Sequence, residues 1–279
     1  MKKLICFVTM LVVFACDKTD EPDPKPAEEV KQQAPFEGGE VDVKINKVLF
    51  NGLLEAEYLY DGNLLAEERR FVAAPSPMFS QTGVFKRSNG VLQNYEVKLR
   101  ALTPAGQNPA DTLKPYFSLN YAPVISDSLR EVTREDLQSG AKTLRIYAFD
   151  KTGYITRQEL WNENKTEKTT FAYTRNDQHN VLKSSTNKQT STIKDETQYL
   201  YDDHPNPFFK LGRDAYGEIS IRSLSPNNPV KETRSLDNVV ISNTNYTYEY
   251  LPNGYPKKVT VRVESTSFPP YSYTMDFIY

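Results

Sequence analysis

The sequence predicts an all-β protein, an antiparallel meander of repeated hairpins that forms a rolled open sheet or a barrel-like sheet with at most one short helix. The chain has 279 residues, of which 18 are Tyr and 14 are Phe. These aromatics recur in pairs two positions apart, which places both rings on one face of a strand. Turns rich in Gly, Asn, Asp or Pro follow the pairs, and alternation then resumes, as in a β-hairpin.

The unit of aromatic pair and turn recurs along most of the chain. Three of the five gaps between its copies are 24 to 28 residues long, about the length of one hairpin. Residues 215–225 are interpreted as an eroded copy, 116–121 and 137–144 as further strands, and Asn89-Gly90 and Asn253-Gly254 as the sharpest turns. The second aromatic of each copy, or of a weaker copy in one case, is Tyr60, Phe85, Phe149, Tyr173, Tyr201 or Tyr250.

Helix signals are scarce. The segment from Ser128 to Gln138 has apolar residues at 129, 132 and 137, and Ser126 or Asp127 could cap a helix there. A short helix and a further strand fit this segment equally well. Elsewhere the pattern alternates with period two or contains Pro.

The repeated units resemble the YD repeats of RHS-type proteins, whose pattern is close to Y-x-Y-D-x-x-G followed by an apolar residue. The best match is formed by Tyr147, Phe149, Asp150, Gly153 and Ile155. The Arg that follows the Gly in that family is absent here. The resemblance spans most of residues 55–279, and it is closest to uncharacterised Bacteroidota surface lipoproteins with a few such repeats. It implies a curved β-sheet and no established activity.

The N-terminus has the layout of a secretory signal peptide. Two Lys precede an apolar run of 12 residues, Leu4–Ala15, which is shorter than the roughly 20 residues of a membrane-spanning helix. The run ends in Val-Phe-Ala-Cys, which resembles the lipobox of bacterial lipoproteins. The resemblance implies that residues 1–15 are removed and that Cys16 carries acyl chains such as palmitate. An ordinary signal peptide with an incidental Cys, or an uncleaved anchor, is the alternative.

The segment that follows predicts a tether. Residues 16–35 contain the lipidated Cys and an acidic, Pro-rich stretch without aromatics, which cannot bury a core. Its 19 residues after Cys16 could reach roughly 60 Å. Residues 36–279 are then a single β-repeat domain. Acidic residues directly after the Cys resemble the surface-export signal of Bacteroidota lipoproteins, which implies an outer-membrane protein that faces the cell surface; the periplasmic face is the alternative.

Composition excludes several kinds of chemistry. With Cys6 in the signal peptide and Cys16 lipidated, residues 36–279 contain no thiol, so they have no disulfide, no Cys nucleophile and no Cys-bound metal. Without Lys2 and Lys3, 32 basic side chains face 36 acidic ones, a net charge of −4, which argues against binding to nucleic acid. We expect no cofactor, no metal and no catalytic residue, and we expect His179 and His204 to lie in solvated turns.

A few residues are candidates for recognition or modification. Trp161 lies just before a polar turn, and Tyr246, Tyr248 and Tyr250 alternate along one segment, so these four rings could stack on a ligand. Packing in the core is the alternative for each of them. Thr112 and Ser128 follow Asp and precede Leu, which resembles the O-glycosylation triplet of Bacteroidota.

Three functions remain open at this point. The first is a non-enzymatic, membrane-anchored protein with a structural or interaction role at the cell envelope. The second is a surface lipoprotein that binds a glycan or peptide through an aromatic face. The third is a hydrolase, for which a pair of carboxylates would have to meet in three dimensions.

Overall fold

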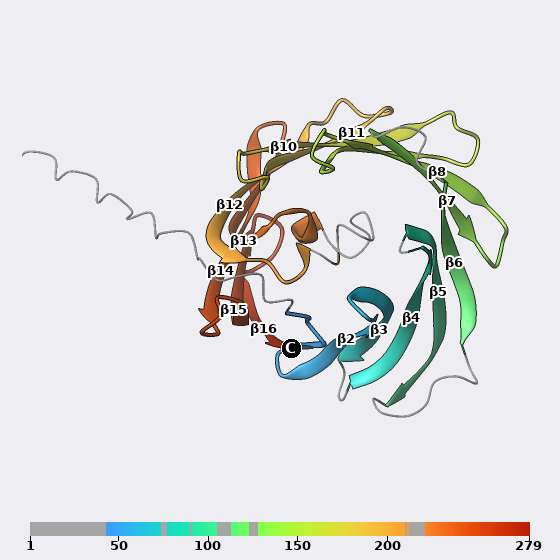
Figure 1. Ribbon diagram of the computed structural model, residues 1–279. Coiled ribbons are helices and arrows are strands. Elements are labelled where there is room, and N and C mark those ends of the chain that lie inside the picture. The colour runs from blue at the N-terminus through green and yellow to red at the C-terminus, as the bar shows by residue number, and fades with distance from the viewer. Residues whose placement is uncertain are drawn as a thin grey trace, which may run out of the picture. The chain divides into compact units, whose positions relative to one another are not determined.

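Sixteen antiparallel strands close into one barrel in the computed structural model, which describes residues 43–73, 77–89, 91–104, 113–122, 128–209, 211 and 221–279. Each strand pairs with its neighbours in the chain, and β1 closes the ring by pairing with β16 (Figure 1). The strands are β1 (Lys47–Phe50), β2 (Leu53–Asp61), β3 (Leu64–Ala73), β4 (Pro77–Ser88), β5 (Val91–Pro104), β6 (Lys114–Tyr121), β7 (Leu129–Asp136), β8 (Lys142–Phe149), β9 (Ile155–Trp161), β10 (Lys168–Arg175), β11 (Val181–Lys188), β12 (Asp195–Pro205), β13 (Asn227–Leu236), β14 (Val239–Tyr250), β15 (Pro256–Ser265) and β16 (Tyr271–Ile278). The predicted all-β meander is confirmed, and the sheet is closed rather than open.

Three local predictions are wrong. The segment 137–144, expected to be a strand, contains the loop 137–141 between β7 and β8, and only its last three residues belong to β8. The segment proposed as a helix, 128–138, forms β7, because Arg130, Val132 and Arg134 alternate with outward residues and the strand pairs on both sides with β6 and β8. Within the proposed eroded hairpin, the described residues Ile221–Leu224 form the 3-10 helix η2. Among the described residues, no helix is long and apolar enough to cross a membrane.

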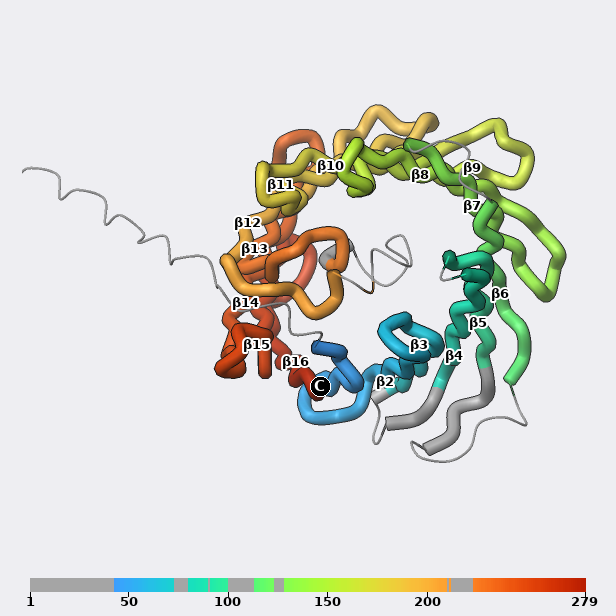
Figure 2. Tube along the Cα trace, viewed as in Figure 1, coloured from blue at the N-terminus to red at the C-terminus, as the bar shows by residue number. Residues whose placement is uncertain are grey.

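The connection between β12 and β13 identifies the inner face of the barrel. Figure 2 shows its described parts inside the ring of strands. Phe208, from this connection, contacts the rings of Tyr58 on β2 and Phe277 on β16 edge to face. Tyr58 and Phe277 therefore face the lumen, and the strand registers assign every other side chain to the inner or the outer face.

The inner face is largely aromatic and aliphatic. The buried core residues Tyr58, Tyr95, Leu119, Tyr147 and Val261 all point inward by this register. The aromatic pairs that define the repeat also face the lumen, since both members of each pair share the inner side of their strand. The excess of Tyr in the composition is thus concentrated inside the barrel.

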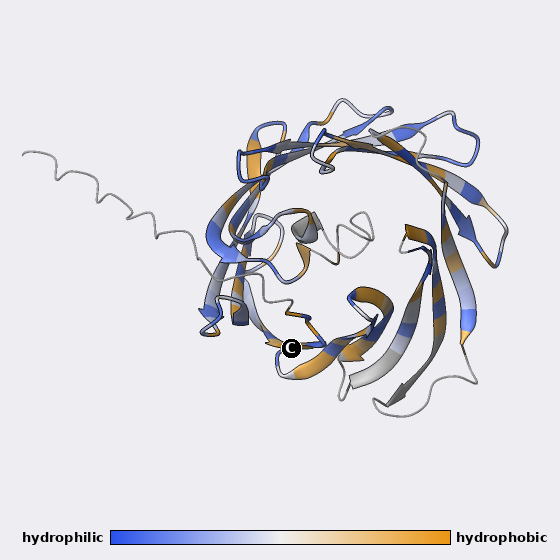
Figure 3. Cartoon of the chain, in the orientation of Figure 1, coloured by the Kyte–Doolittle hydropathy of each residue, from blue (hydrophilic) through white to orange (hydrophobic). Residues whose placement is uncertain are grey.

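The outer face is built from polar and charged side chains. Cross-strand and same-strand ion pairs follow one another around the barrel: Lys47 with Glu57, Arg69 with Glu67, Lys86 with Glu96, Lys142 with Glu135, Lys168 with Glu159, and Lys183 with Glu196. Outward apolar residues such as Leu59, Leu200 and Ile278 are scattered among them. Hydrophilic and hydrophobic residues consequently alternate along the strands (Figure 3).

One irregularity recurs in six hairpins that turn at the same end of the barrel, and β1–β2 and β13–β14 have it at the other end, at Glu55 and Ile241. Directly after the turn, one residue of the second strand has no partner and the register shifts by one, as in a β-bulge. Such bulges increase the local twist and bend the strand, which helps a wide sheet to curve into a ring. In the six hairpins the unpaired residues are Ala66, Gln93, Thr156, Leu182, Val230 and Lys257.

Inward Tyr and Arg side chains tie this end of the barrel together. Tyr60 donates its hydroxyl hydrogen bond to the Ile45 carbonyl at 2.7 Å, and Tyr201 donates to the Val181 carbonyl at 2.9 Å. Each bond joins the end of one strand to the start of the preceding strand. The remaining bonds of this kind run from Arg87 to Leu65, Arg175 to Ile155, Tyr248 to Pro229, and Tyr279 to Pro256.

Gly83 is predicted to be required by the ring of Tyr95. A Cβ on Gly83 would overlap that ring, which stacks on Phe85 with centroids 4.4 Å apart. We expect Gly83→Ala to lower the free energy of unfolding by about 1–3 kcal/mol through overpacking, measured by denaturant unfolding. The control Ser272→Thr adds one carbon on the exposed outer face and should change it by less than about 0.5 kcal/mol. Equal stability of the two variants would contradict the prediction.

Candidate functional site

The connection between β12 and β13 fills part of the lumen and is held from several strands. The Ser225 hydroxyl donates to the Tyr201 hydroxyl at 2.9 Å and accepts from the Val181 amide at 2.9 Å. Arg175 donates to the Leu224 carbonyl at 2.7 Å. Phe208, at the other end, packs between Tyr58 and Phe277. The connection therefore contacts both the β10–β12 wall and the β2–β16 wall.

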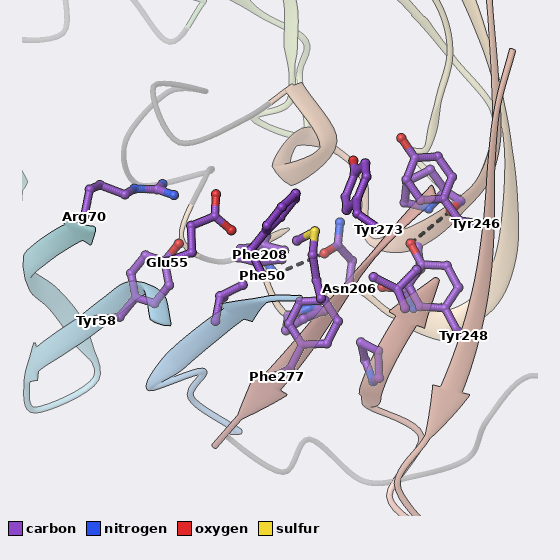
Figure 4. A pocket seen from close by; sticks show the side chains of 17 residues that line it. Phe50, Glu55, Tyr58, Arg70, Asn206, Phe208, Tyr246, Tyr248, Tyr273 and Phe277 are labelled. Carbon is purple, nitrogen blue, oxygen red and sulfur yellow. Dashed lines mark hydrogen bonds between the residues drawn. The ribbon is translucent and has the colours of Figure 1, made fainter. Parts of the chain in front are cut away.

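A cavity of about 260 Å³ lies between this connection and the wall formed by β1, β2, β3 and β13–β16. Figure 4 shows the side chains that converge on it. Most of its lining is apolar or aromatic, and a few polar groups interrupt it. The lining residues are Val48, Phe50, Glu55, Tyr58, Arg70, Asn206, Pro207, Phe208, Asn228, Pro229, Tyr246, Tyr248, Pro256, Val259, Tyr273, Met275 and Phe277.

Tyrosines of β14 form one wall of the cavity. Successive rings of Tyr246, Tyr248 and Tyr250 are nearly parallel and stacked, with interplanar angles of 20° and 21°. The hydroxyls are anchored: Tyr246 donates to Glu232 at 2.7 Å and Tyr248 donates to the Pro229 carbonyl at 3.0 Å. Tyr246 is buried and the other two are half-buried. The row of rings is therefore a fixed wall inside the lumen, and its first two members line the cavity.

Charged groups occupy the opposite end of the cavity, where Glu55, Tyr58 and Arg70 come together (Figure 4). Arg70 donates through Nε to the buried carboxylate of Glu68 and lies over the Tyr58 ring. Burial opposes the charge of Arg70, but the carboxylates of Glu68 and Glu55 favour it, and the balance raises the pKa of Arg70. Burial also raises the pKa of Tyr58, so its hydroxyl stays protonated. This end thus presents a carboxylate, a guanidinium and a hydroxyl to one space.

A polar cluster beside the cavity holds the end of β12. Tyr250 donates its hydroxyl hydrogen bond to Asp202, which also accepts from the amides of His204 at 3.0 Å and Asn228 at 3.2 Å. Burial raises the pKa of Asp202, and these donors oppose the rise. The His204 ring stacks on Tyr250 with centroids 3.8 Å apart. The expectation that His204 lies in a solvated turn is wrong, because it ends β12 as a half-buried residue.

The other predicted residues lie apart from the cavity. Trp161 is on the outer face of β9, where its indole N–H donates to Glu159 at 3.1 Å and Lys168 covers its ring. Ser128 is exposed at the start of β7. His179 lies in a turn with a φ of 64° and stacks on Tyr154. Cys16 and Thr112, together with the 1–15 and 16–35 segments, lie outside the described residues.

Metal binding has no candidate site in the described part of the chain. No group of three or more His, Cys, Asp or Glu side chains comes together there in a way that could hold a metal ion. Asp202 accepts from Tyr250 and from backbone amides, while the His204 ring stacks on Tyr250 and has Nε2 3.7 Å from Asp203 Oδ1.

Sequence reasoning missed the charged end of the cavity. Strict alternation would place Glu55 on the outer face with Glu57. The register between β1 and β2 shifts at this point, because Val48 pairs with Ala56 but Leu49 pairs with Leu54, so Glu55 is left without a partner and lines the cavity. The inward position of Arg70 could have been found from its spacing to the buried Glu68.

Comparison with known proteins yields distant structural neighbours only. No model of a known protein family matches the chain, and no curated protein matches it. A porin-like protein from Bacteroides uniformis ATCC 8492 is 14% identical, with a TM-score of 0.40 over 76% of this chain and 95% of that one. A porin-like protein from Bacteroides vulgatus ATCC 8482 is 12% identical, with a TM-score of 0.40 over 85% of this chain and 99% of that one. Similarity at this level carries no inference about function.

The Tyr250 hydroxyl is predicted to stabilise the ionised form of Asp202. In the folded protein the pKa of Asp202 is raised, so its ionisation removes stability as the pH rises from the unfolded value, about 3.9, through the folded value. Tyr250→Phe removes a donor and raises that pKa further. We expect its loss of stability to be small near pH 3 and about 1.5–3 kcal/mol near pH 7, measured by denaturant unfolding at both values.

Tyr248→Phe is the matched control for this prediction, because it removes a hydroxyl that donates to a neutral carbonyl on the same face of β14. Its effect should be about 0.5–1.5 kcal/mol and should not depend on pH in this range. An effect of Tyr250→Phe that is the same at both pH values would contradict the assignment.

Proposed function

We propose that the chain is a non-enzymatic lipoprotein of the cell envelope, anchored to the outer membrane through Cys16, whose water-facing barrel binds a ligand in its lumen. The polar outer face of the barrel is the observation that carries the proposal. Ion pairs interrupt this face on strand after strand. A membrane-spanning barrel presents an apolar band to lipid, and one Lys or Arg at the bilayer midplane costs about 2–4 kcal/mol. Such a wall suits water, so attachment to a membrane needs an anchor elsewhere in the chain.

The lipobox-like end of the apolar run supplies that anchor. Two or more acyl chains, at about 0.8 kcal/mol per buried CH₂, hold a protein firmly to a membrane. The acidic, Pro-rich residues 17–35 would separate the barrel from the bilayer as a tether.

The interior of the barrel supports binding over a purely structural role. A barrel needs an inner core for stability, but a cavity with anchored aromatic walls and a charged end is the usual composition of a small-molecule site. The nearly parallel rings of Tyr246 and Tyr248 and the groups around Arg70 face the same space. This cavity favours recognition of a ligand inside the barrel, and the glycan- or peptide-binding alternative belongs to this same space.

Removal of the anchor tests the proposal. We expect Cys16→Ala to abolish incorporation of labelled palmitate, while the matched variant Cys6→Ala keeps it. A second variant, in which a cleavable secretory signal without Cys replaces residues 1–16, should move the protein from the membrane pellet to the soluble fraction after ultracentrifugation. The barrel should remain folded, as judged by circular dichroism.

Retention of the second variant in the membrane pellet would overturn the proposal, because neither acyl chains nor a leader segment would then explain the attachment. The barrel wall itself would have to contact lipid, in disagreement with its charged outer face.

Orientation is tested separately. We propose that the protein faces the cell surface, as the acidic residues after Cys16 imply. Protease added to intact cells should digest the barrel domain, whereas a periplasmic control protein in the same cells should survive. Protection of the chain until the outer membrane is permeabilised would place it on the periplasmic face.

A further inference from the structure

We infer that the cavity binds a small zwitterion with an apolar body, the chemistry of a free apolar or aromatic α-amino acid. The inference rests on the proposed function, in which the barrel binds its ligand in the lumen, and it specifies what that ligand is. Three observations support it: the charged groups at one end of the cavity, the apolar residues that line the rest of it, and its volume.

The charged end has hydrogen-bonding capacity that the described residues do not use. The Glu55 carboxylate forms no hydrogen bond or ion pair with any described residue, although it lines the cavity. Arg70 uses Nε for Glu68, and its two terminal nitrogens donate to no residue in the described part of the chain. Glu55 favours the charged form of Arg70, but the two groups form no ion pair with each other. A carboxylate and a guanidinium thus face one space and leave room between them.

A zwitterion satisfies both groups at once. An ammonium group can donate to Glu55, and a carboxylate can accept from the terminal nitrogens of Arg70, which are suited to a planar acceptor. Glu68 already balances the charge of Arg70, but it occupies only Nε. A ligand with an ammonium and no carboxylate expels water from this end and leaves the terminal N–H groups of Arg70 without an acceptor, and a ligand with a carboxylate and no ammonium leaves Glu55 without a donor; both cost free energy. A neutral sugar offers hydroxyls to both groups but no charge-assisted hydrogen bond to either. The two groups together therefore favour a ligand that carries both signs.

The rest of the cavity accepts an apolar body. Phe50, Phe208 and Phe277 lie between the charged end and the tyrosines of β14 (Figure 4), and Met275 also lines the cavity. The volume of about 260 Å³ is just below the roughly 300–1,000 Å³ of sites for drug-sized ligands. A ligand of amino-acid size is compatible with this space, whereas a long acyl chain or an oligosaccharide is too large for it.

The test is a titration of the full-length protein, purified in a mild non-ionic detergent, by isothermal calorimetry. The probes are L-phenylalanine, N-acetyl-L-phenylalanine without the ammonium, L-phenylalaninamide without the carboxylate, glycine without the apolar body, and glucose. We expect L-phenylalanine to bind and each blocked analogue to bind about tenfold more weakly or worse. Glycine and glucose should not bind at the same concentrations.

Two glutamates on the same strand provide the matched variants. Glu55→Gln should weaken L-phenylalanine about tenfold and leave the residual affinity for N-acetyl-L-phenylalanine unchanged, since that probe has no ammonium to lose. Glu57→Gln changes the outward neighbour, which pairs with Lys47 at 2.9 Å, and should alter neither. Circular dichroism of both variants checks that the barrel is intact.

Several results would overturn the inference: no binding of L-phenylalanine at millimolar concentration, equal binding of the blocked analogues, equal effects of Glu55→Gln and Glu57→Gln, or preferential binding of glucose. The membrane-release experiment does not involve the cavity. Release of a folded barrel together with failure of L-phenylalanine to bind would therefore remove this ligand class and leave the proposed anchoring in place.

Discussion

Closure of the sheet is the constraint on which the rest of the structure depends. In a closed barrel every strand has two partners, so no edge remains and each side chain faces either the lumen or the outside. Most rings and buried aliphatic residues lie inside and most ion pairs lie outside, with the buried Arg70–Glu68 pair as an exception. The aromatic lumen, the polar wall and the inner position of the β12–β13 connection all follow from it. A barrel of the same topology with an apolar outer face would require lipid around it instead of water.

The repeated hairpin explains how a chain with an irregular sequence repeat closes into one barrel of sixteen strands. Six hairpins at one end of the barrel carry a bulge near the start of the second strand. In four of them an inward Tyr or Arg opposite the bulge donates to a backbone carbonyl near the start of the preceding strand. In four hairpins the residue opposite the bulge is aromatic: Tyr60, Phe149, Tyr201 or Tyr250. In two others it is an arginine, Arg87 or Arg175. Arg can replace Tyr at this position because both side chains lie on the inner face of the barrel and reach a backbone carbonyl near the start of the preceding strand. Where Arg replaces the aromatic residue, the spacing of aromatic residues in the sequence becomes less regular, although the hairpin and its bulge are still present.

Much of the fold could be predicted from these local patterns, and the exceptions have physical reasons. Period-two alternation and turn residues identify the strands, but Ser128–Gln138 has apolar spacing compatible with a helix, and only pairing with β6 and β8 decides its state. Closure itself depends on β1 meeting β16, a contact between residues more than two hundred positions apart that no local pattern encodes. Tyr246 and Tyr248 could be proposed as candidates from spacing alone. Glu55 could not, because a single shift in register reverses the face that alternation assigns to it.

The candidate site arises where three departures from the regular barrel meet. The bulge in β2 turns a carboxylate inward, the β12–β13 connection places Phe208 across the lumen, and Glu68 holds Arg70 by one nitrogen so that the other two face the cavity. A regular hairpin wall would have filled this space with rings, as it does around Tyr95 and Phe85. Among the described residues, Glu55 forms no hydrogen bond and Arg70 uses only Nε, for Glu68, so charged groups with unused hydrogen-bonding capacity lower the stability of the barrel. A ligand that pairs with these groups would recover that cost. Recognition and stability thus compete in this part of the lumen, while the bulges and carbonyl contacts elsewhere maintain the ring.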